Sequence, residues 1–228
     1  MGFVTLQDVH KVYPLGKTEV HAVQGVSLDI QEGDFISIAG PSGSGKSTVL
    51  NMIGCIDVPT KGSVILDSQD TKTLKDREIT SLRHRFIGFI FQSFNLIPVL
   101  NTYENIEFPL LLARKKLSQR EWIEHLIEEV GLKDWISHRP NELSGGQRQR
   151  VAIARALVTK PRLVLADEPT ANLDSDTGEK IIELMKRINR EQGTTFIFST
   201  HDQDIVQIAD HVIRLLDGKI AEEQRRGQ

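Results

Sequence analysis

The chain opens with two runs in which apolar and polar side chains alternate. Residues 3–13 (FVTLQDVHKVY) and residues 20–30 (VHAVQGVSLDI) have this period of two, and Pro14 and Gly16 lie between them. Such alternation is typical of strands that bury one face, and Pro and Gly between two strands indicate a turn. The N-terminal part is therefore predicted to form antiparallel strands.

Later segments are short and almost wholly apolar, which is typical of strands buried on both faces of a parallel sheet. They include FISIA, FIGFIFQ, LVLA and TTFIFST, and the third of these occupies residues 163–166. Between them, residues 71–85 and 178–191 have helical patterns, and residues 211–223 form a predicted hairpin that turns at Asp217-Gly218. Strands that alternate with helices predict an α/β fold.

The segment 93–159 differs, because it is predicted to be almost wholly helical. We therefore expect one domain, residues 1–228, in which residues 1–92 and 160–228 form a core with its antiparallel β-subdomain. Residues 93–159 would form a helical subdomain inserted into that core. The stretch from Phe94 to Leu100 carries more apolar side chains than a loop needs, so it is either core or a docking surface.

Composition narrows the function classes. The 228 residues include 28 basic and 31 acidic side chains. The resulting net charge of −3 lacks the excess of positive charge that is typical of nucleic-acid-binding proteins. The single cysteine, Cys55, cannot form an internal disulfide, which fits a reducing compartment. The N-terminus lacks the pattern of a secretory signal, and no apolar run is long enough to span a membrane. We expect a cytoplasmic location, and work at a membrane only through a partner.

One stretch carries a specific chemical signal. GPSGSGKS, Gly40 to Ser47, follows an apolar strand and precedes a helix. A loop without side-chain bulk lets backbone N–H groups surround a phosphate, and the helix directs its positive end at the same anion. Lys46 is expected to reach the β- and γ-phosphates, and Ser47 to place its hydroxyl on Mg²⁺. The pattern predicts a polyphosphate ligand.

A second glycine-rich helix start occurs later in the chain. LSGGQ, Leu143 to Gln147, stands directly before a helix rich in Arg and Ala. Backbone N–H groups and a helix dipole would again point at an anion. A simple helix cap explains Gly145 and Gly146 individually, although it does not explain the whole string.

Polar residues at the ends of apolar strands supply the remaining candidates. Asp167 and Glu168 end one strand, where open α/β sheets place their ligands. Asp167 could hold Mg²⁺ and Glu168 could act as general base, although two such acids could also merely cap the next helix. Gln92 and His201 end two other strands. Gln92 could coordinate Mg²⁺ or the attacking water, and His201 could sense the γ-phosphate, or each could simply mark where its strand reaches the surface.

Together these motifs resemble, over essentially the whole chain and in the same order, the ATP-binding subunits of ATP-binding-cassette (ABC) transporters. The resemblance implies a P-loop NTPase (RecA-like) core with a mainly parallel sheet, an N-terminal antiparallel β-subdomain and an α-helical subdomain. It also implies that two copies face each other head to tail, so that Ser144, Gly145 and Gly146 of one copy close over the ATP of the other. Hydrolysis would then let the copies separate.

The resemblance also implies the roles of individual residues. Glu168, His201 and Gln92 correspond to the catalytic positions, and Ser47, Gln92 and Asp167 to the positions around Mg²⁺. Tyr13 corresponds to the aromatic residue that stacks on adenine. The residues expected at ATP are Tyr13, Gly40, Pro41, Ser42, Gly43, Ser44, Gly45, Lys46, Ser47, Thr48, Ser144, Gly145, Gly146, Gln147 and Asp174.

A narrower resemblance lies in IGCIDVPTKG and in GFIFQSFNLIPVLNTYENIEFPLLL. These segments are similar to the subgroup that serves lipoprotein release and macrolide export, and amino-acid import ATPases share much of the pattern. In that subgroup a membrane permease docks near the segment from Gln92 to Leu100, which would hold the chain on the inner face of the cell membrane.

Three alternatives remain at this level. The chain could couple hydrolysis to transmembrane signalling or envelope remodelling, or it could be a soluble ABC ATPase without transport. It could also be another P-loop protein. The LSGGQ string argues against a kinase, and the lack of an N-K-x-D string argues against a GTPase.

Overall fold

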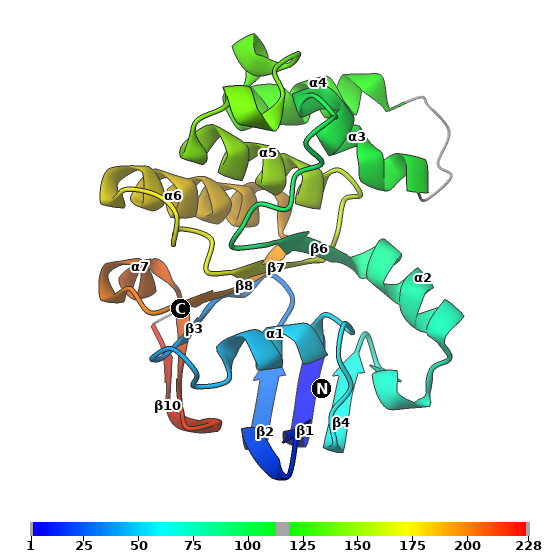
Figure 1. The fold of residues 1–228 in the computed structure, drawn as a ribbon, viewed down its shortest axis with the longest axis vertical. Coiled ribbons are helices and arrows are strands. Elements are labelled where there is room, and N and C mark those ends of the chain that lie inside the picture. The colour runs from blue at the N-terminus through cyan, green and yellow to red at the C-terminus, as the bar shows by residue number, and fades with distance from the viewer. Residues whose placement is uncertain (1, 113–118, 227–228) are drawn as a thin grey trace.

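The computed structural model describes residues 2–112 and 119–226. Figure 1 shows helices α3, α4 and α5 at one end of the molecule, a six-stranded sheet in the middle, and an antiparallel sheet at the other end. This arrangement confirms the predicted α/β class with its antiparallel N-terminal part.

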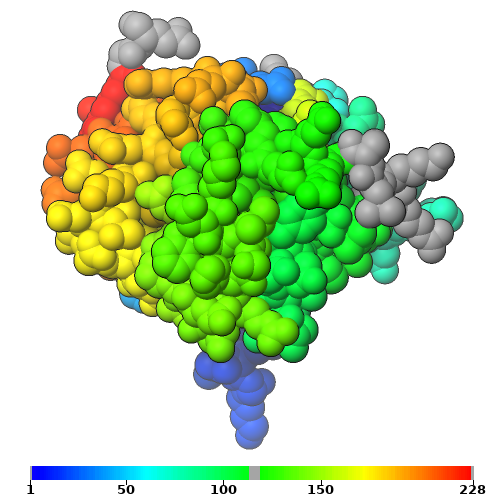
Figure 2. All heavy atoms as spheres, turned by 90° about the horizontal axis from the view of Figure 1, so that it is seen from above, coloured from blue at the N-terminus to red at the C-terminus, as the bar shows by residue number. Residues whose placement is uncertain are grey.

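The antiparallel sheet forms from the alternating N-terminal runs. Its strand order is β2-β1-β4-β5, and Tyr13 pairs with Val20 next to the hairpin turn. The β1–β2 hairpin projects from the body of the molecule, as the blue segment of Figure 2 shows. The strands are β1 (Val4–Leu15), β2 (Thr18–Ile30), β4 (Lys61–Leu66) and β5 (Gln69–Asp70).

The central sheet has the strand order β10-β9-β3-β8-β7-β6. All its neighbouring strands are parallel except β9 and β10, which form the predicted hairpin. The carboxyl ends of β3, β6, β7 and β8 therefore meet at one edge. The strands are β3 (Phe35–Ala39), β6 (Ile87–Ile90), β7 (Leu163–Asp167), β8 (Thr195–Thr200), β9 (His211–Leu216) and β10 (Lys219–Arg225).

Helices cover both faces of this sheet. The α-helices are α1 (Lys46–Ile53), α2 (Asp76–Phe86), α3 (Thr102–Leu112), α4 (Arg120–Glu129), α5 (Gly145–Leu157), α6 (Ser175–Gln192) and α7 (Gln203–Ile208). Three short 3₁₀ helices are η1 (Thr71–Thr73), η2 (Lys133–Trp135) and η3 (Pro140–Glu142).

Two cores lie on opposite faces of the central sheet, as a period of two requires. On β8, Phe196 and Phe198 pack in the core beneath the helical end, whereas Ile197 packs in the core shared with the antiparallel sheet. Each of these side chains is fully buried. Burial of a large apolar side chain contributes about 1.5–3 kcal/mol, so the continuous apolar strands stabilise the sheet from both sides.

Two sequence predictions about element ends are wrong in detail. The helix predicted for residues 71–85 is divided into η1 and α2, because Asp70 accepts a hydrogen bond from the Lys72 amide and Glu78 accepts one from the Lys75 amide. The strand predicted to end at Gln92 ends at Ile90 instead. Gln92 consequently lies in the loop beyond the sheet edge.

The single thiol is buried near the end of α1. Cys55 is 9% exposed, and burial raises the pKa of its thiol to about 11. Within the described residues, no helix combines the length and the apolar character that crossing a bilayer requires.

Candidate active site

The loop between β3 and α1 has no room for a side chain at two of its glycines. Gly45 has φ of +100°, and a Cβ there would lie 2.4 Å from the carbonyl oxygen of Ala22. A Cβ on Gly40 would lie 2.3 Å from the carbonyl oxygen of Leu215. The loop therefore lies against the backbones of β2 and β9, and Gly45, the N-cap residue of α1, provides no capping side chain. Its first N–H groups have no partner within the helix, so they can bind an anion.

Lys46, the first residue of α1, is held beside this loop. Its Nζ donates hydrogen bonds to the carbonyl oxygens of Gly40 at 2.9 Å and Pro41 at 3.1 Å. The same Nζ lies 3.5 Å from Oε1 of Glu168, and the lysine side chain is only 7% exposed. An ammonium group in this position can bind a phosphate that enters the loop.

Oxygen atoms from three elements meet next to Lys46. The Ser47 hydroxyl donates to Oδ1 of Asp167 at 2.9 Å, and the Ser199 hydroxyl donates to the same oxygen at 2.6 Å. The backbone N–H of Glu168 donates to the Ser199 hydroxyl at 2.9 Å. Ser199 was not predicted as a site residue. Its only sequence signal is a hydroxyl in the apolar run TTFIFST, where it is fully buried.

Glu168 is the most unusual residue of the site. Its φ of +47° lies in the left-handed region, which non-glycine residues rarely adopt, and such strain is concentrated at functional sites. Its carboxylate lies between two cationic or polar partners, with Nδ1 of His201 3.0 Å from Oε2 and Lys46 on the other side. Because a carboxylate only accepts, the Nδ1 of His201 carries the proton in this contact.

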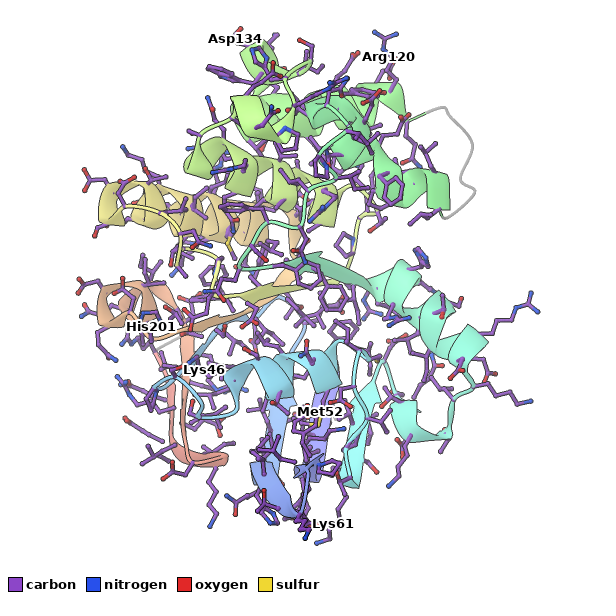
Figure 3. The ribbon with its side chains drawn as sticks, in the orientation of Figure 1. Lys46, Met52, Lys61, Arg120, Asp134 and His201 are labelled. Carbon is purple, nitrogen blue, oxygen red and sulfur yellow. The ribbon has the colours of Figure 1, made fainter. Side chains whose placement is uncertain are left out.

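A cavity of about 570 Å³ is lined by Lys46, Ser47 and Glu168. The loop after β3, the first turn of α1, Gln92, Glu168 and His201 all line it. Part of β2 closes one side, through Val20, His21 and Ala22. Figure 3 shows Lys46 and His201 on the same side of the molecule, next to the sheet edge.

Tyr13 lies on β1, paired with the cavity-lining Val20, and its side chain is partly exposed. Its hydroxyl donates to Oδ2 of Asp57 at 2.6 Å. Lys11 forms an ion pair with the same aspartate. Sequence reasoning singled out Tyr13 but neither of these two partners.

The second glycine-rich helix start is arranged differently. Ser144 caps α5 by accepting from the Gln147 amide at 3.2 Å, and the Gln147 side chain accepts from the Ser144 amide at 2.7 Å. Gly146 packs so closely on α6 that a Cβ would lie 2.7 Å from Thr177. Among the described residues, none of Ser144–Gln147 lines the 570 Å³ cavity.

Asp174 is also outside this cavity. It caps α6, and the hydrogen bond that it accepts from the Thr177 amide lowers the pKa of its carboxyl. The structure therefore brings the predicted phosphate, metal and base residues together in one chain, and leaves the LSGGQ residues and Asp174 apart from them.

Three further hydrogen bonds connect α5 and the loop after Glu168 to Gln92 and the residues that follow it. Asn172 donates to the Gln92 carbonyl oxygen at 2.7 Å. Arg155, on α5, donates to the carbonyl oxygens of Phe94 and Asn95, which have φ of +61° and +48°. Burial lowers the pKa of Arg155 to about 10. The sequence showed only that this helix is rich in arginine, and nothing in it predicted the contact of Arg155 with the loop after Gln92.

A strand, a glycine loop and an uncapped helix, with an acidic pair at the end of a neighbouring parallel strand, define the class of phosphate-loop nucleotide-hydrolysing proteins. Within that class, the model of the ABC transporter family matches residues 23–171. The chain belongs to the ABC transporter family, as an ATP-binding subunit, and it is an ABC-type ATPase. This sets aside the kinase and GTPase alternatives.

Known proteins are similar over the whole chain. An uncharacterized ABC transporter ATP-binding protein of Methanocaldococcus jannaschii, MJ0796, is 47% identical, and the match covers 97% of each chain. Its dimeric structure in a post-hydrolysis state, bound to ADP and Pi, has a TM-score of 0.91 and covers 99% of this chain and 100% of that one.

Two relatives with named systems are similar as well. The lipoprotein-releasing system ATP-binding protein LolD 1 of Rhodopseudomonas palustris is 44% identical, with 95% of this chain and 97% of that protein covered. The macrolide export ATP-binding/permease protein MacB of Syntrophobacter fumaroxidans is 44% identical over 98% of this chain, which corresponds to 32% of its own length.

Proposed function

We propose that two copies of this chain dimerise head to tail around two Mg-ATP and drive a separate membrane permease of the lipoprotein-release or efflux type. The observation that carries the proposal is the separation of the two glycine-rich helix starts. Ser144–Gln147 stand outside the cavity that contains Lys46 and Glu168. A symmetric dimer with an isologous interface can supply them from the second copy.

The residues of the phosphate loop bind and orient the nucleotide. Backbone N–H groups at the start of α1 and the Lys46 ammonium hold the β- and γ-phosphates. Because Lys46 and Glu168 are 3.5 Å apart, a γ-phosphate on the lysine comes within reach of the glutamate. The phosphate loop and Lys46 thus place the scissile bond beside the base.

The oxygen atoms around Ser47 are suitable ligands for Mg²⁺. The Ser47 hydroxyl and the Asp167 carboxylate converge within 2.9 Å, and Mg²⁺ favours such oxygen ligands together with substrate phosphates and water. Ser47, Asp167 and the Gln92 side chain would hold the ion. When bound, it neutralises charge that develops on the phosphates during transfer.

Glu168 is the general base in this proposal. Its carboxylate accepts the proton of the attacking water, and His201 fixes the carboxylate through the Nδ1 contact at 3.0 Å. Gln92 lines the same cavity and can orient that water through its amide. Asp174, Thr48 and Tyr13 complete the predicted nucleotide contacts.

A second cavity supports docking of the permease. Its volume is about 420 Å³, and it lies between α2, β6 and α5, next to the loop after Gln92. Its lining is mostly apolar and includes Ile56, Phe89 and Phe91. Asn95 also lines it, and Val99, four residues further along the chain, is 72% exposed. We infer that the segment from Gln92 to Leu100 forms one wall of this docking site, within a helical subdomain of residues 93–159 inserted into the core.

The relatives support the same coupling. One bears the name of a lipoprotein-releasing system, and another joins an ATP-binding part to a permease in its name. A permease bound at the second cavity would hold the chain on the inner face of the membrane.

The test uses the Glu168→Gln variant, which keeps the size of the side chain but cannot accept the proton. We expect ATP binding to persist, turnover to fall by about 10²–10⁴-fold as for loss of a general base, and an ATP-dependent dimer to accumulate in gel filtration. A second variant, Glu168→Gln with Ser144→Arg, should bind ATP and stay monomeric. Normal turnover in the first variant, or a dimer in the second, would contradict the proposal.

A further inference from the structure

Three side chains from two distant parts of the chain form a cluster beside the β1–β2 hairpin. The Tyr13 hydroxyl donates to Oδ2 of Asp57, and Lys11 pairs with Oδ1 of the same carboxylate. Lys11 also donates to the Val58 carbonyl oxygen at 2.8 Å. The side chains of Lys11 and Asp57 are 13% and 26% exposed, so these two side chains are largely shielded from water, whereas Tyr13 is partly exposed.

Asp57 is itself attached to the helix that begins at the phosphate loop. The backbone N–H groups of Ile56 and Asp57 donate to the carbonyl oxygen of Asn51, on α1, at 2.9 and 3.2 Å. The Val58 amide donates to Oδ1 of Asp57 at 2.7 Å. Since α1 is a rigid element that starts at Lys46, Asp57 links the position of the Tyr13 ring to the phosphate end of the site.

Lys11 has a second contact that limits how the ring can be used. Its Nζ lies 4.9 Å from the centroid of the Tyr13 ring, a cation–π distance, and so it covers one face of the ring. A planar ligand can therefore stack only on the other face. Tyr13 becomes a one-sided platform at a fixed place.

We propose that Asp57, with Lys11, is the positioning element for the nucleobase: it fixes the Tyr13 ring relative to the phosphate loop and leaves a single face for adenine. The proposal rests on the proposed nucleotide function and assigns roles to two residues that do not touch the phosphates. It predicts that both act on affinity for the base and leave phosphate binding unchanged.

The protonation states agree with this geometry. Burial opposes ionisation of Asp57, but hydrogen bonds from Lys11 and Tyr13 outweigh it, so the pKa of the carboxyl lies below its usual value. Burial and the hydrogen bond to Asp57 raise the pKa of the Tyr13 phenol. At neutral pH the phenol keeps its proton and can donate it to a charged acceptor.

The experiment compares ATP with inorganic tripolyphosphate, which has no base, by calorimetry on the full chain. Base stacking on an aromatic ring contributes about 1–3 kcal/mol, so Tyr13→Ala should weaken ATP binding by about tenfold or more. Asp57→Ala and Lys11→Met should weaken it by roughly threefold. Tripolyphosphate should bind all three variants as it binds the parent.

Controls separate this role from a general structural one. Lys61→Met and Asp134→Ala alter exposed residues of the same types, and Figure 3 shows them at opposite ends of the molecule. Both should leave ATP binding unchanged. Asp57→Asn, which keeps an acceptor for the phenol, should restore part of the loss. In a Tyr13→Ala background, Asp57→Ala should have no further effect, because its partner is gone.

The outcomes are distinguishable. If Asp57→Ala weakens the binding of ATP and of tripolyphosphate equally, or if it weakens the binding of neither ligand, the positioning role is wrong. If the parent binds both ligands with equal affinity, the base is not recognised, and the inference fails while the phosphate site stands. If the parent binds neither ligand, the proposed function itself fails. Should Asp57→Ala not fold, Tyr13→Phe removes the same hydrogen bond with the ring retained, and it must show the same selective loss.

Discussion

The two glycine-rich helix starts, at α1 and at α5, resemble each other in sequence and differ in structure. The start of α1 has no capping side chain, and the helix opens into a cavity with Lys46 at its first position. The start of α5 is capped on itself, by the reciprocal hydrogen bonds of Ser144 and Gln147. Glycine at a helix start is thus not enough to make an anion site within one chain.

This difference is the basis of the proposal that the start of α1 binds its anion within one chain and that the start of α5 needs a second copy. At α1 the anion is met by N–H groups and by an ammonium in one concave place. At α5 one N–H group is already used by the serine, and the described residues around Gly145 and Gly146 are parts of α6 and the loop before it. In the proposed dimer, the second start would contact the nucleotide bound by the other copy.

The largest effect should come from removing the charge at α1. Lys46→Ala should weaken ATP binding by roughly 10- to 100-fold, because hydrogen bonds to charged groups contribute about 1.5–3 kcal/mol. Calorimetry on the monomer measures it, and Lys61→Ala is the matched control because that lysine is exposed. Unchanged affinity in Lys46→Ala would mean that α1 is not the phosphate site.

Changing α5 should separate binding from turnover. Ser144→Arg should leave ATP affinity of the monomer unchanged and reduce turnover by about 100-fold or more, since half of each composite site is blocked. Steady-state ATPase assays and calorimetry on the same preparation report the two quantities. A parallel loss of affinity would show that both helix starts serve one chain, and would remove the contrast between them.

A smaller effect is expected at the other end of α5. Arg155→Met keeps the aliphatic stem but removes the donors to the carbonyl oxygens of Phe94 and Asn95, and an intramolecular hydrogen bond contributes about 0.5–1.5 kcal/mol. Hydrogen exchange of residues 93–97 should become faster, whereas exchange in α1 should not change. Unaltered exchange in that loop would show that Arg155 does not hold it.

The smallest effect tests the cap of α5 itself. Ser144→Ala should lower the free energy of unfolding by about 1 kcal/mol, as loss of an N-cap does, and Ser144→Thr should retain most of it. Urea denaturation followed by circular dichroism measures both. If alanine is neutral, the hydrogen bond from the Gln147 amide does not stabilise the helix, and the two starts differ less than their geometry indicates.

Sequence reasoning recovered the fold class and assigned Lys46, Glu168, His201 and Gln92 to one site, and all four line the 570 Å³ cavity. It could do so because each lies at or just beyond the end of an apolar strand or in a motif with fixed spacing, and parallel strands bring such ends to one edge. These signals are local in the chain. They can be recognised in the sequence without knowledge of any long-range contact.

Other residues of the site were missed for the opposite reason. Ser199 donates a hydrogen bond to Asp167, and Asp57 accepts one from Tyr13, so each partner is 32 or more positions away. A lone serine or aspartate gives no local pattern. The break between η1 and α2 was missed because side-chain caps at Asp70 and Glu78 competed with helix continuation.

The buried thiol has a practical consequence for following this protein in motion. Only thiolates react with maleimide dyes, and Cys55 is the one cysteine of the chain, buried, with its pKa raised to about 11. It should stay silent at neutral pH, so the natural sequence already serves as a labelling background. Fluorophores on cysteines introduced at the exposed positions Lys61 and Asp134 would then report, by energy transfer between copies, how the two copies approach and separate during each turnover.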